Sequence, residues 1–164
     1  MNYHDITKDD MKNGDGLRVV LWVAGCSHGC FHCQNPVTWD PKGGLFFGEA
    51  EEQEIFRELD KSYISGITFS GGDPLHESNV EEITSFAKKI KERYPQKTLW
   101  LYTGSLWEEI QELAVLKYLD VLVDGKYIEA MHPGQHPWVG SSNQRVIDVP
   151  VSLELGRIVL HKVS

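Results

Sequence analysis

The chain has 164 residues, which is the size of one compact domain, so we expect a single domain over 1–164. Hydrophobic residues make up 41% and charged residues 24%, a globular balance that argues against disordered, collagen-like and coiled-coil proteins. The net charge of −8 argues against nucleic-acid binding, because a phosphate backbone needs a basic face. The start resembles no signal peptide, and the apolar stretch 19–26 is too short to cross a bilayer. We therefore expect a cytoplasmic protein that binds neither nucleic acid nor membrane.

Runs of apolar and β-branched residues predict the strands. The first, 17–24, is nearly continuous, as in a strand that is covered on both faces. Further runs lie at 66–70, 98–102 and 119–123. Weaker strand candidates are 145–149 and 157–160.

Helical spacing marks three segments between these runs. Residues 49–59 place apolar side chains on one side of a helix. The sequence Ser78–Glu81 has the form of a capping box and predicts the start of a helix that continues to Tyr94. Ser105–Glu108 has the same form and predicts a helix that extends toward Leu113.

The alternation of strands and helices predicts an α/β fold with a parallel sheet. The chain is too short for a closed eight-unit barrel but has room for about four to six parallel strands with flanking helices. A partial (open) TIM-like barrel is the fold we predict, and a doubly wound sheet is the alternative. In both folds the active face lies at the carboxyl ends of the strands.

Cys26, Cys30 and Cys33 are the only cysteines of the chain and follow the first predicted strand with the spacing C-x3-C-x2-C. An odd and tightly clustered set does not build a disulfide framework and indicates a metal or cluster site in a reducing compartment. Three thiolates can hold three corners of a 4Fe–4S cluster, which leaves one iron open to a ligand. A structural zinc site completed by His28 or His32 is the alternative that the spacing leaves open.

The cysteine loop resembles that of the radical S-adenosylmethionine enzymes. Later segments narrow the resemblance to the family of activating proteins of anaerobic ribonucleoside-triphosphate reductase. The segments that carry it are Asn13–Gly16, Cys33–Trp39, Ser70–His76, Tyr102–Gly104, Val123–Lys126 and Gly140–Gln144. The resemblance covers nearly the whole chain and identifies 1–164 as a single radical S-adenosylmethionine domain.

The resemblance implies an oxidoreductase with a 4Fe–4S cluster and S-adenosylmethionine as cofactors. One electron from a reduced flavodoxin-type donor cleaves S-adenosylmethionine, and the resulting 5′-deoxyadenosyl radical removes hydrogen from a backbone glycine of the reductase large subunit. Two alternatives stay open at this point. One is activation of another glycyl-radical enzyme such as pyruvate formate-lyase, and the other is a zinc-stabilised binding module without catalysis.

Glycines after the second predicted strand allow a ligand to approach the backbone closely. The resemblance assigns Gly71, Gly72 and Asp73 to the methionyl amino end of S-adenosylmethionine, although the same residues could form a plain turn. Thr103 ends the third strand and would line the ligand pocket, or would be a polar join to the next helix. Asp124 ends the fourth strand and would face the site, or would form an Asp-Gly turn.

The resemblance further places the backbone around His32, Cys33 and Gln34 against the adenine of S-adenosylmethionine. No catalytic residue is expected beyond the cluster ligands, because the cofactor carries the chemistry. Gly140–Gln144 is a family signature for which the sequence gives no role. Tryptophans 39, 107 and 138 are either packing residues or parts of a docking surface.

Overall fold

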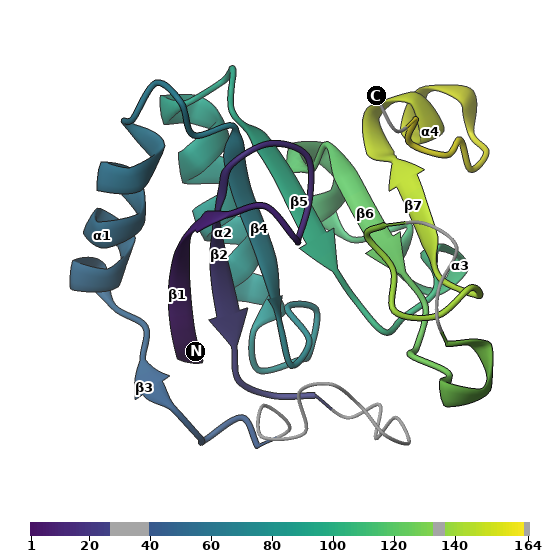
Figure 1. The fold of residues 1–164 in the computed structure, drawn as a ribbon, viewed down its shortest axis with the longest axis horizontal. Coiled ribbons are helices and arrows are strands. Elements are labelled where there is room, and N and C mark those ends of the chain that lie inside the picture. Colours follow the sequence, from purple (N-terminus) through teal and green to yellow (C-terminus); the bar gives the residue numbers. More distant parts are fainter. Residues whose placement is uncertain (27–39, 133–136, 163–164) are drawn as a thin grey trace.

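The computed structural model describes residues 1–26, 40–132 and 137–162, and Figure 1 shows it as a ribbon. Within these ranges the strands form one seven-stranded sheet in the order β3-β1-β2-β4-β5-β6-β7. The strands are β1 (Asn2–Asp10), β2 (Arg18–Val23), β3 (Leu45–Phe46), β4 (Gly66–Gly71), β5 (Thr98–Tyr102), β6 (Val121–Asp124) and β7 (Arg145–Asp148). The central strands β2, β4, β5 and β6 are parallel, and the outer strands pair antiparallel with their neighbours.

The central parallel strands confirm the strands predicted from the apolar runs. The weaker candidate at 145–149 corresponds to β7. The candidate at 157–160 is wrong, because only Leu160 forms an isolated bridge, with Ile147. Strands β1 and β3 were not predicted, since β1 is largely polar and β3 has only two residues.

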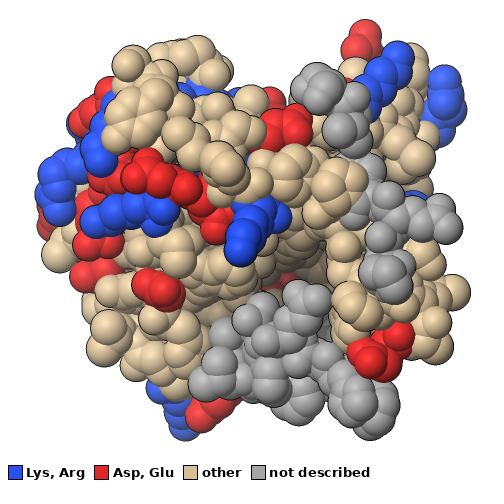
Figure 2. Space-filling view, viewed as in Figure 1, with Lys and Arg blue, Asp and Glu red and all other residues tan. Residues whose placement is uncertain are grey.

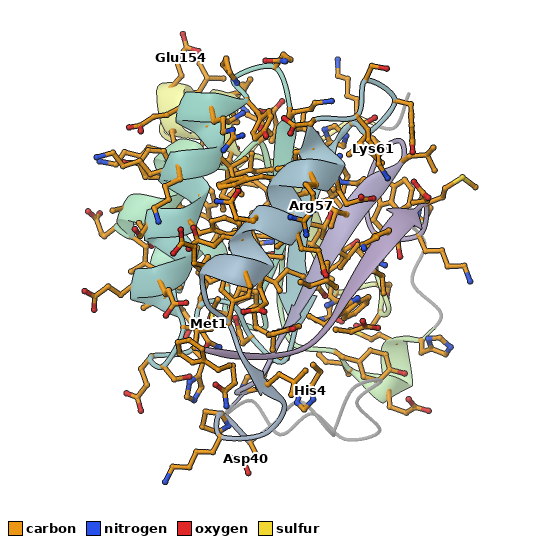
Figure 3. All side chains as sticks on the ribbon, turned by 90° about the vertical axis from the view of Figure 1, so that its left-hand side faces the viewer. Met1, His4, Asp40, Arg57, Lys61 and Glu154 are labelled. Atoms are coloured by element: carbon orange, nitrogen blue, oxygen red, sulfur yellow. The ribbon has the colours of Figure 1, made fainter. Side chains whose placement is uncertain are left out.

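The helical segments lie between the strands. The described α-helices are α1 (Glu49–Leu59), α2 (Val80–Arg93), α3 (Trp107–Ile110) and α4 (Val149–Leu155), and the described 3-10 segments are η2 (Ala114–Tyr118) and η3 (Glu129–Met131). Figure 3 shows α1, which carries Arg57, beside α2 on the same side of the strands. Within the described ranges, no helix has the length and apolarity that crossing a membrane requires.

Both predicted capping boxes are wrong in register. Asn79 is the N-cap of α2, but its side-chain amide donates to the backbone oxygens of Ala24 (2.8 Å) and Asp73 (3.0 Å) instead of capping the helix. Helix α3 begins after Leu106, whose backbone N–H donates to the Glu109 carboxylate at 2.8 Å. The Asn79 side chain therefore joins the ends of β2 and β4, a long-range role that a local cap pattern does not reveal.

Helices α1, α2 and α3 and the 3-10 segment η2 pack against one face of the sheet. Alternate residues of the central strands, such as Leu21, Phe69 and Leu101, belong to the large buried core together with residues of α1, α2, α3 and η2. The opposite face carries a smaller cluster around Trp100 and Val123. A doubly wound sheet has helices on both faces, whereas in the described ranges the main helices lie on one face, and an open, partial barrel stays our proposal for this fold.

A buried arginine fixes the loop that precedes β2. The Arg18 guanidinium donates to the hydroxyls of Thr68 (2.9 Å) and Thr98 (2.8 Å), and to the backbone oxygens of residues 15, 67 and 98. All five of its N–H donors are thereby used. Burial lowers the pKa of Arg18 to about 10. Thr68 also donates to the backbone oxygen of Asn13 at 2.6 Å, so the segment Asn13–Gly16 is held against the sheet.

Candidate functional site

A cavity of about 280 Å³ lies at the carboxyl ends of the parallel strands. Figure 2 shows the surface hollowed near the centre of the view. The strand ends that line the cavity contribute Cys26 after β2, Ser70, Gly71 and Gly72 at β4, Tyr102, Thr103 and Gly104 at β5, and Gly125 after β6. Ligands of α/β proteins bind at this edge of the sheet.

The structure brings together the described residues that the sequence assigned to a cofactor site. Of the residues assigned to the site, Cys26, Gly71, Gly72 and Thr103 line the cavity. The remaining assignments, Cys30, His32, Cys33 and Gln34, lie outside the described residues. Asp73 is buried just behind the cavity wall.

Glycine is required at the end of β4 by a close approach of two strands. Gly71 has a φ of +107°, and a Cβ built on it would lie 2.5 Å from the backbone N and O of Val23. The next residue, Gly72, donates its backbone N–H to the Val23 oxygen at 2.8 Å. Without side chains, these two residues leave their backbone open to a ligand beside Cys26.

The Asp73 carboxylate joins the ends of β4 and β5. It accepts hydrogen bonds from the backbone N–H of Leu75 (2.8 Å), the Thr103 hydroxyl (3.0 Å) and the backbone N–H of Gly104 (3.0 Å). Its own backbone N–H donates to the oxygen of Gly25 at 2.6 Å. These contacts support a positioning role for Asp73, and its direct contact with a cofactor stays a prediction.

The cysteines fit an iron–sulfur cluster by their chemistry. Cys26 is half-buried, follows β2 directly and lines the cavity. In the part of the chain that the structure describes, no group of three or more His, Cys, Asp or Glu side chains could hold a metal ion. The other two cysteines lie outside that part. Thiolates are the usual ligands of such clusters, so this donor set and the adjoining glycine backbone suit a cluster with a bound cofactor.

Comparisons with known proteins agree with this chemistry. A sequence model described as a 4Fe-4S single cluster domain matches residues 12–147. The anaerobic ribonucleoside-triphosphate reductase-activating protein of enterobacteria phage T4 is 47% identical over 89% of this chain and 93% of its own length. The proteins of the same name from Haemophilus influenzae and Escherichia coli K12 are 40% and 39% identical, over 88% and 89% of this chain and 96% and 97% of their own.

The chain belongs to the family of anaerobic ribonucleoside-triphosphate reductase-activating proteins. The matched sequence model describes an iron–sulfur domain, which favours a cluster over the structural zinc site that the cysteine spacing left open. The share of each relative that is covered shows that the resemblance extends over nearly the whole of their length.

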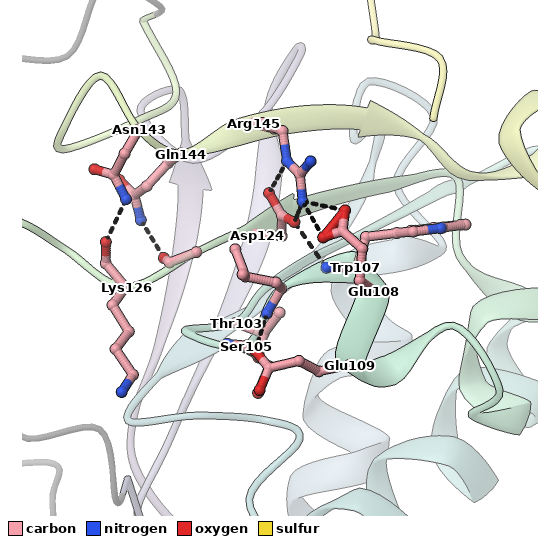
Figure 4. Close-up of polar contacts among 12 residues, drawn as sticks. Thr103, Ser105, Trp107, Glu108, Glu109, Asp124, Lys126, Asn143, Gln144 and Arg145 are labelled. Atoms are coloured by element: carbon pink, nitrogen blue, oxygen red, sulfur yellow. Dashed lines mark hydrogen bonds and ion pairs between the residues drawn. The ribbon is translucent and has the colours of Figure 1, made fainter. Parts of the chain in front are cut away.

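Asp124 of this activating-protein chain is buried in an ion-pair network rather than exposed to the cavity. Its carboxylate accepts hydrogen bonds from Nε (3.1 Å) and Nη2 (2.5 Å) of Arg145 and from the backbone N–H of Trp107 (2.8 Å), as Figure 4 shows. Arg145 also pairs with Glu108 at 3.0 Å. The hydrogen bonds that Arg145 donates to Asp124 and Glu108 raise the pKa of Arg145, and the bond that Glu108 accepts from Arg145 lowers the pKa of Glu108. The network fixes the start of α3 beside the cavity.

The signature Gly140–Gln144 has a structural role that the sequence did not reveal. The Gln144 side-chain oxygen accepts from the backbone N–H groups of Gly140 (2.8 Å) and Ser141 (3.1 Å). Its amide nitrogen donates to the backbone oxygen of Gly125 at 3.0 Å (Figure 4). One side chain thus fastens the signature to the end of β6. The long-range partner, Gly125, gives no local sequence signal.

The tryptophans 107 and 138 have different surroundings. Trp107 is 5% exposed and belongs to the main core, so the docking role considered for it is wrong. Trp138 packs edge-on against Trp100 with ring centroids 5.9 Å apart, and it lines the cavity. Trp39 lies outside the described residues.

Tyr102 is a cavity residue that sequence reasoning missed. Parallel pairing places it in one row with Trp22 and Ser70, on the face without the main helices. Its hydroxyl is buried and has no hydrogen-bond partner within the described structure. Burial raises the pKa of Tyr102. A buried hydroxyl without a partner is unfavourable by about 1–3 kcal/mol, so such a group beside a cavity indicates a partner supplied by a ligand.

Removing the Tyr102 hydroxyl is expected to leave the free energy of unfolding unchanged or to raise it by up to about 1 kcal/mol, because no hydrogen bond is lost. Tyr94→Phe is the matched control. The Tyr94 hydroxyl donates to Asp60 at 2.6 Å and lies 3.1 Å from the backbone oxygen of Phe56, so its loss is expected to lower the unfolding free energy by about 1–2 kcal/mol. Urea unfolding of Tyr102→Phe and Tyr94→Phe compares the two, and an equal loss in both would contradict the assignment.

Proposed function

We propose that this chain activates an anaerobic ribonucleoside-triphosphate reductase by producing a glycyl radical on it, with a 4Fe–4S cluster and S-adenosylmethionine as cofactors. When bound, the cluster would supply one electron, received from a reduced flavodoxin-type donor, for the cleavage of S-adenosylmethionine into methionine and a 5′-deoxyadenosyl radical, and that radical would take hydrogen from a glycine of the reductase. The observation that carries the proposal is the convergence of Cys26, the Gly71–Gly72 backbone and Thr103 on one cavity.

The residues of this chain would hold and orient the cofactors. Cys26, Cys30 and Cys33 would be the three thiolate ligands of the cluster. The cavity-lining backbone of Gly71 and Gly72 would bind the methionyl end of S-adenosylmethionine. Asp73 and Thr103, hydrogen-bonded to each other at 3.0 Å, fix that backbone in place. Holding reactants in a fixed geometry supplies a large part of the rate in such reactions.

The backbone around His32, Cys33 and Gln34 would contact the adenine. We further propose a cytoplasmic location, because cysteine clusters of this kind persist in a reducing compartment. The walls of the cavity, which include Trp22 and Trp138, would exclude water from a reactive radical.

Anaerobic reconstitution with iron and sulfide tests the proposal. We expect about four irons per chain and the formation of 5′-deoxyadenosine from S-adenosylmethionine under reduction. Addition of the reductase is then expected to give the electron paramagnetic resonance signal of a glycyl radical. One tightly held zinc and no cleavage would contradict the proposal, and cleavage with no radical on the reductase would contradict the partner.

A further inference from the structure

We infer that an apolar surface beside the cavity mouth is the docking site of the reductase, an inference that rests on the proposed function. The surface consists of the residues Leu106, Ile128 and Met131, which are 42%, 42% and 44% exposed. Ile128 and Met131 belong to residues 125–132, here called the rim loop. Leu106 immediately precedes α3.

The rim loop is continuous with the cavity. Its residues Gly125 and Tyr127 line the cavity wall. Leu106 lies close to Gly125, since a Cβ built on that glycine would be 3.8 Å from Leu106 Cδ2. The apolar surface therefore begins where the cavity wall ends.

The family signature 140–144 holds the rim loop in one conformation. The hydrogen bonds between them join Gln144 Nε2 to Gly125 O (3.0 Å), Asn143 Nδ2 to Lys126 O (2.9 Å), Ser141 Oγ to the Ile128 N–H (3.1 Å) and the Ser142 N–H to Met131 O (3.0 Å). Figure 4 shows the first two. Exposed apolar side chains on a fixed backbone form a pre-organised surface, which lowers the entropic cost of binding a partner.

The size of the cavity indicates how a protein substrate reaches it. A cavity of about 280 Å³ lies at the lower end of the range for small-molecule sites and cannot admit a folded domain. A partner must therefore insert only a short segment, and its remaining surface must rest on the mouth. A glycine has no side chain to recognise, so recognition falls to the surface around the mouth. Apolar contacts at Ile128 and Met131 would also exclude water while the radical is present.

A second group of exposed apolar residues provides a control. Leu153 and Leu155 of α4 are 43% and 53% exposed. In Figure 1, α4 lies at the top of the view, whereas the parallel strands β2, β4, β5 and β6 point their carboxyl ends toward the bottom. Neither leucine lines the cavity at the carboxyl ends of the strands.

The double variant Ile128→Glu/Met131→Glu tests the docking site, and Leu153→Glu/Leu155→Glu changes the charge equally at the control position. We expect the rim variant to bind the reductase at least about tenfold more weakly and to form the glycyl radical correspondingly slowly. Its iron content and its cleavage of S-adenosylmethionine without the reductase are expected to match the unmodified protein. The conservative variant Ile128→Leu/Met131→Leu is expected to retain binding.

Binding is measured by calorimetry with the reductase large subunit, separately from radical formation. Unchanged binding of the rim variant, or an equal loss in the α4 variant, would overturn the docking site. If the unmodified protein binds the reductase but forms no radical on it, the proposed function fails while the binding comparison still decides the docking site.

Discussion

Replacing Cys26 by serine is expected to abolish cluster binding and all cleavage of S-adenosylmethionine while the chain stays folded. Serine has nearly the shape of cysteine, but its hydroxyl stays protonated near neutral pH, whereas a cluster iron requires a thiolate. Cys26 is half-buried and follows β2 rather than lying within it. We therefore expect the free energy of unfolding of the cluster-free protein to change by less than about 0.5 kcal/mol.

The measurement is iron and sulfide per chain after anaerobic reconstitution, followed by the yield of 5′-deoxyadenosine. Ser70→Ala is the control variant, because it makes a small side-chain change in the same cavity without removing a thiolate. Ser70→Ala is expected to keep its iron. A Cys26→Ser variant with a full iron content and full cleavage would show that Cys26 is not a ligand.

The sequence predicted the elements whose side chains are buried on both faces. Strands β2, β4, β5 and β6 could be found because each contains a short run of apolar and β-branched residues and is buried along nearly its whole length. Strand β1 could not be found in this way. Only part of its length is covered, and its pairing with β2 depends on backbone hydrogen bonds that polar residues make equally well.

In the candidate site, too, the features that could be predicted are those that are local in the sequence. The cysteine loop and the Gly71–Gly72 turn are local patterns, so their chemistry could be proposed before the structure was known. The interactions that hold the site together join distant segments. Thr103 lies 30 residues from Asp73, and Arg18 lies 80 residues from Thr98. No local pattern specifies such pairs, and they depend on the strand order of the sheet.

Asp73→Asn is expected to lower the free energy of unfolding by about 3 kcal/mol and to weaken binding of S-adenosylmethionine. The two carboxylate oxygens accept hydrogen bonds from Leu75, Thr103 and Gly104, and an asparagine offers one oxygen and an NH₂ group in their place. At least one donor then faces another donor in a buried site, where a lost hydrogen bond to a charged group is worth about 1.5–3 kcal/mol. Chemical denaturation of the cluster-free protein gives the first quantity, and calorimetry of the reconstituted protein gives the second.

Thr103→Val separates the positioning role of Asp73 from direct contact with the cofactor. This variant keeps the side-chain volume but removes one donor to the carboxylate and the acceptor of the Ser105 backbone N–H (3.2 Å), so we expect a smaller loss of about 1–2 kcal/mol in unfolding free energy. If Asp73 acted only by touching S-adenosylmethionine, Asp73→Asn would weaken cofactor binding and leave the cofactor-free protein as stable as before. A loss of stability in both variants, larger for Asp73→Asn, instead requires that the carboxylate joins β4 to β5. The backbone at Gly72, which we propose as the ligand-binding segment, would then be held in place by a buried charge that need not contact the ligand.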